Sequence, residues 1–350
     1  MSIADSIKAD AQSLAVRPGH AVRLIGLLLG LVLLVALSQL SLLVGARAIA
    51  PSTALEALFA YDANSVDHIV IMDYRLPRTL LSLLCGAAFG VAGALIQAAT
   101  RNPLADPGVL GVNAGAAFCV TLAVGLFGVQ SIHALLWFSF LGAIIITLAV
   151  YSLGATGREG ATPVRLVLAG VALSAVLGGI GSSITLLNPQ AFDAMRQWAI
   201  GSAAGRNMDV VVAVAPFIGI GLVIALVTAP SLNAVALGDD LARSLGANTL
   251  RARILTLVAV TLLAGAGTAA CGPIGFVGLM VPHVVRWFTG PDQRLIIPMT
   301  MIYAPVLLLI ADIAGRLVLF PGELEAGIVT AFIGAPVLIL LARRKKASGL

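Results

Sequence analysis

Charged side chains are scarce in this chain. Asp, Glu, Lys and Arg make up 11% of its 350 residues, whereas hydrophobic residues make up 59% and the mean hydropathy is +1.04. A soluble domain usually carries about a quarter of charged residues. This composition excludes a water-soluble globular protein and indicates a protein that crosses the membrane several times.

Lysine and cysteine are also rare, and each scarcity excludes a kind of site. The only lysines are Lys8, Lys345 and Lys346, and none follows a glycine-rich turn, so the chain has no P-loop with which to hydrolyse ATP. The three cysteines lie in or beside apolar segments, a placement that fits neither a disulfide framework nor a zinc site. We therefore expect no catalytic residue, no metal site and no bound cofactor on this chain.

Titratable side chains are rare within the apolar segments, and Asp312 is the main exception. Asp312 stands four residues before Arg316, so a helix places both on one face and a structural ion pair is expected. Proton-coupled carriers and ion channels need buried carboxylates, histidine relays or charged filters. Their scarcity here disfavours a stand-alone channel or ion-coupled carrier.

Ten apolar segments are candidates to cross the bilayer, which takes a helix of about 20 residues. They are residues 22–45, 77–100, 111–128, 134–154, 164–187, 209–230, 254–271, 275–288, 295–314 and 325–341. The eighth is the weakest because glycines and prolines interrupt it, and a broken helix survives only where other protein surrounds its backbone. The predicted fold is an all-α polytopic membrane protein with ten transmembrane helices in residues 22–343, between an N-terminal tail at 1–21 and a basic tail at 344–350.

Glycines are frequent, and some are spaced to bring helices together. Gly86 and Gly90 form a GxxxG pair, which leaves one helix face without side chains and allows a close backbone approach. This spacing favours a compact helical bundle.

The distribution of positive charge predicts the orientation. With the N-terminus inside and ten crossings, all of the 21 basic residues lie on the cytoplasmic side except Arg47, Arg75, Arg78, Arg196, Arg206 and Arg316. This asymmetry follows the positive-inside rule. We therefore expect a multi-pass protein of the cytoplasmic (inner) membrane with both termini cytoplasmic. The formal net charge of +5 then reflects its orientation in the lipid bilayer, not binding to nucleic acid.

Two polar segments between apolar ones have distinct patterns. The loop at residues 101–111 contains two prolines and two glycines, which is typical of a rigid loop that meets something at the membrane surface. The segment at 237–247 places Leu237, Leu241 and Leu245 one helical turn apart, which predicts a short amphipathic surface helix. Such a helix either rests on the lipid interface or docks into a cleft of another protein.

Five motifs occur in order between residue 74 and the end of the chain. They are Tyr74-Arg-Leu-Pro-Arg78, the loop at 101–111, the segment at 237–246, Gly272-Pro-Ile-Gly-Phe-Val-Gly-Leu-Met-Val-Pro-His283 and Gly327-Ile-Val-Thr-Ala-Phe-Ile-Gly-Ala-Pro336. Together they resemble the iron-siderophore (FecCD-type) permease family of ABC importers, which also includes vitamin B12 permeases. Residues 102–116 are most similar to ferric-enterobactin permease subunits.

The resemblance implies a type II ABC importer permease bundle that moves a ferric siderophore, of the catecholate type, across the cytoplasmic membrane. It also implies a second, homologous permease subunit and two copies of an ATPase subunit, which bind the ATP and Mg. An extracytoplasmic siderophore-binding protein completes the set of expected partners.

Site residues follow from the same resemblance. Outward arginines of the family grip the binding protein, and Arg75, Arg78 and Arg316 match them. The segment at 237–246 matches the helix that couples to the ATPase, with Gly238, Asp239, Ala242, Leu245 and Gly246. Gates are expected near Arg158 and Thr162 inside and near Asn188, Trp198 and Ser202 outside.

Several of these residues have a second interpretation. Asn188-Pro189 ends an apolar segment, and residues 191–201 are expected to form a short re-entrant helix that carries Trp198, although Trp198 equally suits an interface anchor. Arg78 could instead cap a helix. Where many relatives have Glu-Leu-Pro, this chain has Glu323-Leu-Glu325, so we expect a different charge at the outer mouth.

The function itself has two alternatives. Within the resembled family, the cargo could be haem or cobalamin, although the four histidines form no evident ligand pair for haem. Outside it stands the ion-coupled carrier. An importer subunit should co-purify with an ATPase, and a stand-alone carrier should not.

Overall fold

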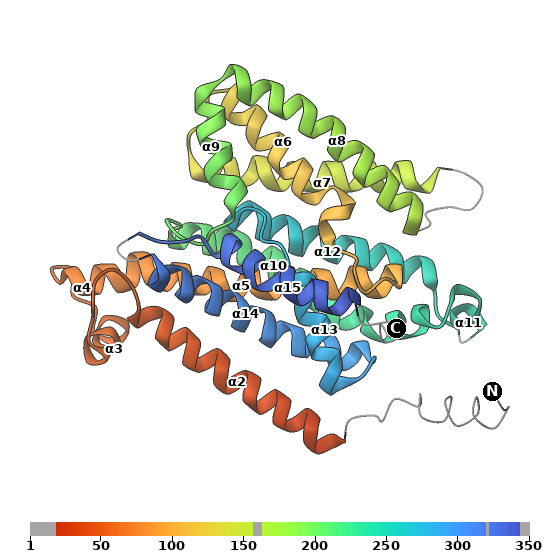
Figure 1. Cartoon of the computed structure of the whole chain (residues 1–350), viewed down its shortest axis with the longest axis horizontal. Helices are drawn as coiled ribbons and strands as arrows, with labels where there is room; N and C mark the ends of the chain where they lie inside the picture. The colour runs from red at the N-terminus through yellow and green to blue at the C-terminus, as the bar shows by residue number, and fades with distance from the viewer. Residues whose placement is uncertain (1–18, 157–162, 245, 320–321, 344–350) are drawn as a thin grey trace.

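The computed structural model describes residues 19–156, 163–244, 246–319 and 322–343, and the regular structure within these residues is helical (Figure 1). The main helices are α2 His20–Leu43, α5 Leu76–Thr100, α6 Val112–Gly125, α7 Ile132–Ala155, α8 Pro163–Leu187, α9 Pro189–Ile200, α10 Met208–Ala236, α12 Thr249–Cys271, α13 Val277–Thr289, α14 Gln293–Val318 and α15 Ala326–Arg343. Short elements are α3 Pro51–Phe59, α4 Val66–Ile69, the π-helix Val70–Arg75, the 3-10 helix Pro107–Leu110 and α11 Asp239–Ser244.

Each of the ten predicted segments coincides with one main helix. Among the described residues, seven helical stretches are long and apolar enough to cross a membrane: α2, Val66–Thr100, α7, α8, α10, α12 and α14. The apolar helices Val112–Gly125 and Ala326–Leu340 are shorter, and α13 has 13 residues. The all-α membrane fold is confirmed, and the count of ten spans stays a prediction.

The helices form layers around α5. In Figure 1, α6, α7, α8 and α9 pack together at the top, α5 runs through the centre, and α2 lies along the lower edge. α5 packs against α10, α12, α13 and α14. The most apolar part of the Val66–Thr100 stretch is 83% buried, against 17% for α8 and 11% for α2. The core therefore surrounds α5, and α2 and α8 present most of their surface outward.

Glycines on α5 explain how it packs so closely. A Cβ at Gly86 would lie 2.6 Å from Pro305 Cα of α14, and one at Gly90 would overlap Ala304. A Cβ at Gly93 would overlap the backbone of Gly278 on α13. The close approach predicted from the Gly86/Gly90 pair is confirmed, and α14 is the helix that uses it.

The ends of several helices differ from the predicted segments. α10 continues through Pro230 to Ala236, because helices in a membrane bundle tolerate a proline where neighbouring groups satisfy the freed backbone carbonyl. α12 begins at Thr249 rather than near 254, because the side chain of Asn248 caps it by accepting from the N–H of Arg251. The short elements between residues 51 and 75 were not predicted, because each has at most nine residues and is too short to cross a membrane.

The contact between α5 and α14 can be tested with Gly86→Leu. The added side chain must displace the α14 backbone, so we expect a loss of about 1–3 kcal/mol or more in stability. Gly219→Leu is the matched control, because nothing lies within 4 Å of a Cβ at this exposed α10 position. Thermal unfolding of the two purified variants in detergent should show a lower midpoint for Gly86→Leu only. Equal midpoints would contradict this packing.

Candidate functional site: a cavity at one end of the bundle

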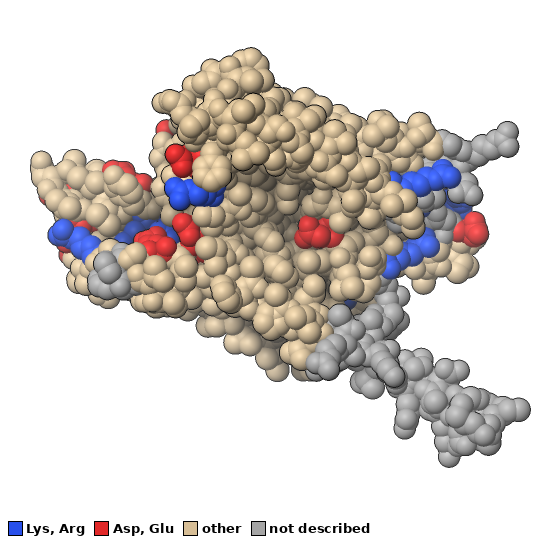
Figure 2. All heavy atoms as spheres, turned by 45° about the horizontal axis from the view of Figure 1, so that its top comes forward, with Lys and Arg blue, Asp and Glu red and all other residues tan. Residues whose placement is uncertain are grey.

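A cavity of about 680 Å³ opens at the α9 end of the molecule. Its walls come from the first turns of α5 and α10, from α6, α7 and the loop between them, from α9 and the loop after it, from the last turn of α12 and from the segment before α15. Figure 2 shows the molecule hollowed on this face, with acidic and basic atoms gathered at one end of the hollow. We call this the α9 cavity. Its polar and aromatic lining residues are Arg78, Gln130, Gln190, Gln197, Trp198, Ser202, Arg206, Glu323 and Glu325.

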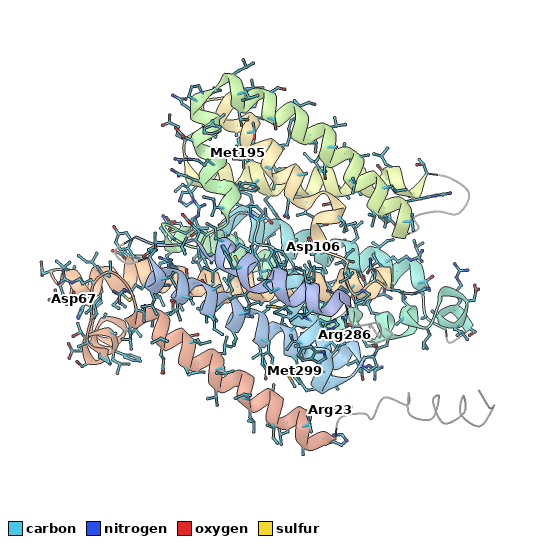
Figure 3. The ribbon with its side chains drawn as sticks, in the orientation of Figure 1. Arg23, Asp67, Asp106, Met195, Arg286 and Met299 are labelled. Atoms are coloured by element: carbon cyan, nitrogen blue, oxygen red, sulfur yellow. The ribbon has the colours of Figure 1, made fainter. Side chains whose placement is uncertain are left out.

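The short helix α9 forms one wall and is fixed at its first residue. The side chain of Asn188 accepts from the N–H of Ala191 at 3.0 Å and donates to the carbonyl of Gly125 at 3.1 Å, so it caps α9 and ties it to α6. Pro189 occupies the first helical position, where no backbone donor is needed. The predicted short helix is confirmed, and Figure 3 places it by Met195.

Two of the predicted outer gate residues lie on the cavity wall. Trp198 lines the cavity and packs against the core, which favours a wall residue over an interface anchor. Ser202 also lines the cavity, and its backbone N–H donates to the carbonyl of Cys271 at 2.7 Å. Asn188 is not among the lining residues of the cavity, but it caps α9, which forms one wall. The predicted inner gate residues, Arg158 and Thr162, lie outside the described residues.

Three helix ends meet next to the cavity: the end of α9, the end of α12 and the start of α15. The N–H of Gly327, at the start of α15, donates to the carbonyl of Gly201 at 3.0 Å, and Ser202 joins the end of α12. Gly201 and Gly272 both have positive φ, and a Cβ on either would overlap a neighbouring backbone carbonyl. The break between α12 and α13 therefore lies inside protein, as expected for a broken helix in a membrane.

The arginines predicted to be exposed docking contacts are instead buried. Arg75, Arg78 and Arg316 are 6%, 9% and 4% exposed. The expected exposure was wrong because the positive-inside pattern identifies the end of the bundle at which a residue lies, and not the direction of its side chain. Their docking role was inferred from the family resemblance and stays a prediction.

These arginines surround one carboxylate and the end of α2. Arg78 Nε lies 2.9 Å from Asp312 Oδ1, and Arg78 also pairs with Glu323 at 2.6 Å. Arg316 pairs with Asp312, which confirms the predicted ion pair, and donates to the carbonyls of Ser41 and Val44. Arg75 donates to the carbonyls of Leu42 and Leu43 at 2.8 and 2.7 Å.

The loop at residues 101–111 is held against the bundle. Arg101 has φ of 53° and its Nε donates to the carbonyl of Val235 on α10 at 2.9 Å. Asp106, near the centre of the view in Figure 3, accepts from the N–H of Gly108 at 2.7 Å. Burial raises the pKa of the Asp106 carboxyl, and this hydrogen bond partly offsets the rise. These bonds hold the loop against the bundle, and parts of it face inward; a contact of the loop with a partner stays a prediction.

The predicted coupling helix lies at the opposite end of the bundle from α9. α11 is shorter than the segment at 237–246, because Gly238 and Gly246 have φ of 110° and 79° and end the helical run on both sides. Leu241 is 57% exposed, whereas Ala242 is fully buried and cannot meet a partner directly. Leu245 and the side chain of Asp239 lie outside the described residues.

The cavity also contains residues that the sequence analysis did not assign to the site. From the sequence, Arg206 was recognised only as an outward basic residue. The three glutamines that line the cavity were not recognised, because they lie on segments without a motif. In the described part of the chain, no group of three or more His, Cys, Asp or Glu side chains is arranged to hold a metal ion.

A bundle of apolar helices, with a cavity at one end and an exposed surface helix at the other, fits a membrane transport subunit. The chain belongs to the FecCD transport family, whose sequence profile matches residues 32–344. It is 48% identical to the ferric enterobactin transport system permease protein FepD of Escherichia coli (strain K12), over 94% of this chain and 97% of that protein.

Other relatives extend this likeness. The iron(3+)-hydroxamate import system permease protein FhuB of Bacillus subtilis (strain 168) is 40% identical over 91% of this chain and 83% of its own length. Among solved structures, one described as a metal-chelate type ABC transporter in an inward-facing conformation has a TM-score of 0.78 and 28% identity, covering 89% of this chain and 97% of that one.

The buried ion pairs can be tested with Asp312→Asn. This change leaves Arg78 and Arg316 without their shared charge, so we expect a loss of about 3–5 kcal/mol in stability. The control is Asp193→Asn, because the Asp193–Arg196 pair on α9 is 3.8 Å long and both side chains are about two-thirds exposed. Denaturant unfolding in detergent should separate the two variants clearly. A small loss for both would refute the importance of the buried cluster.

Proposed function

We propose that this chain is the permease subunit of an ATP-driven ABC importer that moves a ferric siderophore of the catecholate type across the cytoplasmic membrane. The observation that carries the proposal is the 48% identity to the ferric enterobactin permease along nearly the whole length of both chains. The α9 cavity supports it, since its volume lies in the range of about 300–1,000 Å³ that is usual for small-molecule sites.

The α9 end faces outward in this proposal, and the α11 end faces the cytoplasm. The first residues of α2 and the helix α11 lie on the same side of the view in Figure 1, away from α9. Basic residues such as Arg251 and Arg253 lie near α11, as the positive-inside rule requires of a cytoplasmic end. Both termini are then cytoplasmic, and the protein belongs in the inner membrane.

Each end and one side of the bundle has a proposed partner. Two copies of an ATPase subunit, which bind ATP and Mg, couple through α11 of this chain and its counterpart in a second permease subunit. That second subunit, a homologous different chain, packs against α8, where nothing lies within 4 Å of a Cβ at Gly178 or Gly179. The siderophore-binding protein docks over the α9 cavity, on a surface that the buried arginine cluster supports from beneath.

The transport step follows from the hinges around α9. ATP binding closes the ATPase dimer, moves α11 and biases the bundle between two arrangements. The hinges of this movement are the two ends of α9: the contact of Asn188 with Gly125 and the backbone bonds of Gly201 and Ser202, which must rearrange when α9 shifts. Opening of this segment admits the chelate from the binding protein.

Reconstitution tests the proposed function. The permease pair, the ATPase and the co-encoded binding protein, assembled in proteoliposomes, should take up radioiron as its siderophore chelate only with ATP and the binding protein. Parallel assays with haem and cobalamin separate the two alternative cargoes. Uptake of a ferric chelate without the ATPase would refute the importer assignment and favour a stand-alone carrier.

The coupling role of α11 can be tested with Leu241→Glu. A carboxylate at this exposed position would be buried without a cation in an apolar interface. We therefore expect the affinity for the ATPase to fall by about tenfold or more, with a matching loss of uptake. The control is Leu55→Glu on α3, where a leucine of similar exposure, 58% against 57%, lies at the other end. ATPase binding is measured by co-purification. Unchanged binding by Leu241→Glu would show that α11 rests on lipid instead.

A further inference from the structure

The charged side chains that line the α9 cavity differ in whether they have an ion-pair partner. Arg78 and Glu323 pair with each other at 2.6 Å, and Arg78 also pairs with Asp312. Arg206 and Glu325 line the same cavity, and within the described ranges neither has an oppositely charged side chain at ion-pair distance. The cavity therefore presents one unpaired cation and one unpaired anion.

The backbone that carries Arg206 is fixed. Arg206 follows Gly205, whose φ of 69° turns the chain. Just before this turn, the N–H of Ala204 donates to Ser202 Oγ at 3.1 Å. Ser202 is itself bound to the end of α12 at 2.7 Å. Arg206 Nε is buried and has no hydrogen-bond partner. A buried donor on a fixed loop is costly unless another group accepts from it, and a ligand in the cavity could supply such an acceptor.

Glu325 is held on the opposite side of the same junction. Its backbone carbonyl accepts from the N–H groups of Ile328 and Val329, so Glu325 caps the start of α15. Two residues on, Gly327 is bound to Gly201 at the end of α9. The backbone that carries the Glu325 carboxylate is thus anchored at the junction of α15 and α9.

The remaining polar lining is neutral and suits an oxygen-rich ligand. Gln130, Gln190 and Gln197 offer amide donors, and Trp198 offers an aromatic face and one N–H. A chelate with anionic oxygens would therefore find its single unpaired positive contact at Arg206, and an unpaired negative charge at Glu325.

We propose that Arg206 and Glu325 set the charge selectivity of the α9 cavity. Arg206 binds the anionic oxygens of a ferric chelate, and Glu325 weakens that binding so that the chelate leaves again. Transport requires this balance, because a site must bind well enough to admit its cargo and weakly enough to release it. The inference rests on the proposed function and adds the residues that decide which chelates the cavity accepts.

The test uses the assembled permease–ATPase complex in nanodiscs, without the binding protein. Two probes differ in charge: a trianionic ferric tris-catecholate and a neutral ferric tris-hydroxamate. Quenching of tryptophan fluorescence measures binding, and Trp198→Phe identifies the part of the signal that comes from the cavity. Arg206→Gln should bind the tris-catecholate about tenfold more weakly, and Glu325→Gln about tenfold more tightly, with changes of about twofold or less for the tris-hydroxamate.

Matched variants separate cavity charge from general surface charge. Arg196→Gln and Asp193→Asn remove the same charges from α9 outside the cavity lining and should leave both affinities unchanged. Arg206→Lys keeps the charge and should retain most of the tris-catecholate affinity. In proteoliposomes, Glu325→Gln should lower both the KM and the kcat of tris-catecholate uptake, because tighter binding slows release.

The outcomes distinguish the inference from the proposed function. If wild-type complexes import a ferric chelate but Arg206→Gln and Glu325→Gln change both probes equally, or neither, the selectivity role is refuted and the importer assignment stands. If wild-type complexes import no ferric chelate at all, the proposed function fails. An Arg206→Lys variant as weak as Arg206→Gln would also refute a charge-based contact.

Discussion

A carboxylate inside an apolar bundle is costly unless cations surround it, and Asp312 is fully buried between Arg78 and Arg316. Each of these two arginines also binds a second group. Arg78 reaches Glu323 before α15, and Arg316 donates to the carbonyls of Ser41 and Val44 at the end of α2. Arg75 donates to the two carbonyls between them, those of Leu42 and Leu43. One buried charge therefore orders α2, α5, α14 and the segment before α15 at the same end of the bundle, and the wall of the α9 cavity depends on it.

Irregular backbone in a membrane protein needs protein partners for its polar groups. Here the breaks after α9, after α12 and before α15 supply partners for one another through Gly201, Ser202, Cys271 and Gly327. A junction of this kind is ordered but lacks the repeated hydrogen bonds of a helix. It is therefore the place where the bundle can rearrange at low cost, and α9 is attached to it directly.

The two ends of the molecule differ in chemistry as a transporter requires. The α9 end combines a cavity, amide donors, an aromatic ring and unpaired charges. The α11 end presents an exposed leucine on a helix that glycines delimit on both sides. The central helix α5 connects the two, since its glycines let it pack against α13 and α14 without intervening side chains.

The sequence by itself determined the membrane class, the positions of the main helices, the short helix after Asn188 and the family, because apolar runs, caps and motifs are local signals. The Asp312–Arg316 pair was also predictable from its four-residue spacing. Only the tertiary structure decided where side chains point. Arg75 and Arg316 turn inward to cap a helix distant in sequence, Ala242 lies on the buried face of α11, and Arg206 and Glu325 meet one cavity from segments more than a hundred residues apart. Such contacts depend on how helices pack, and no spacing within a single segment encodes them.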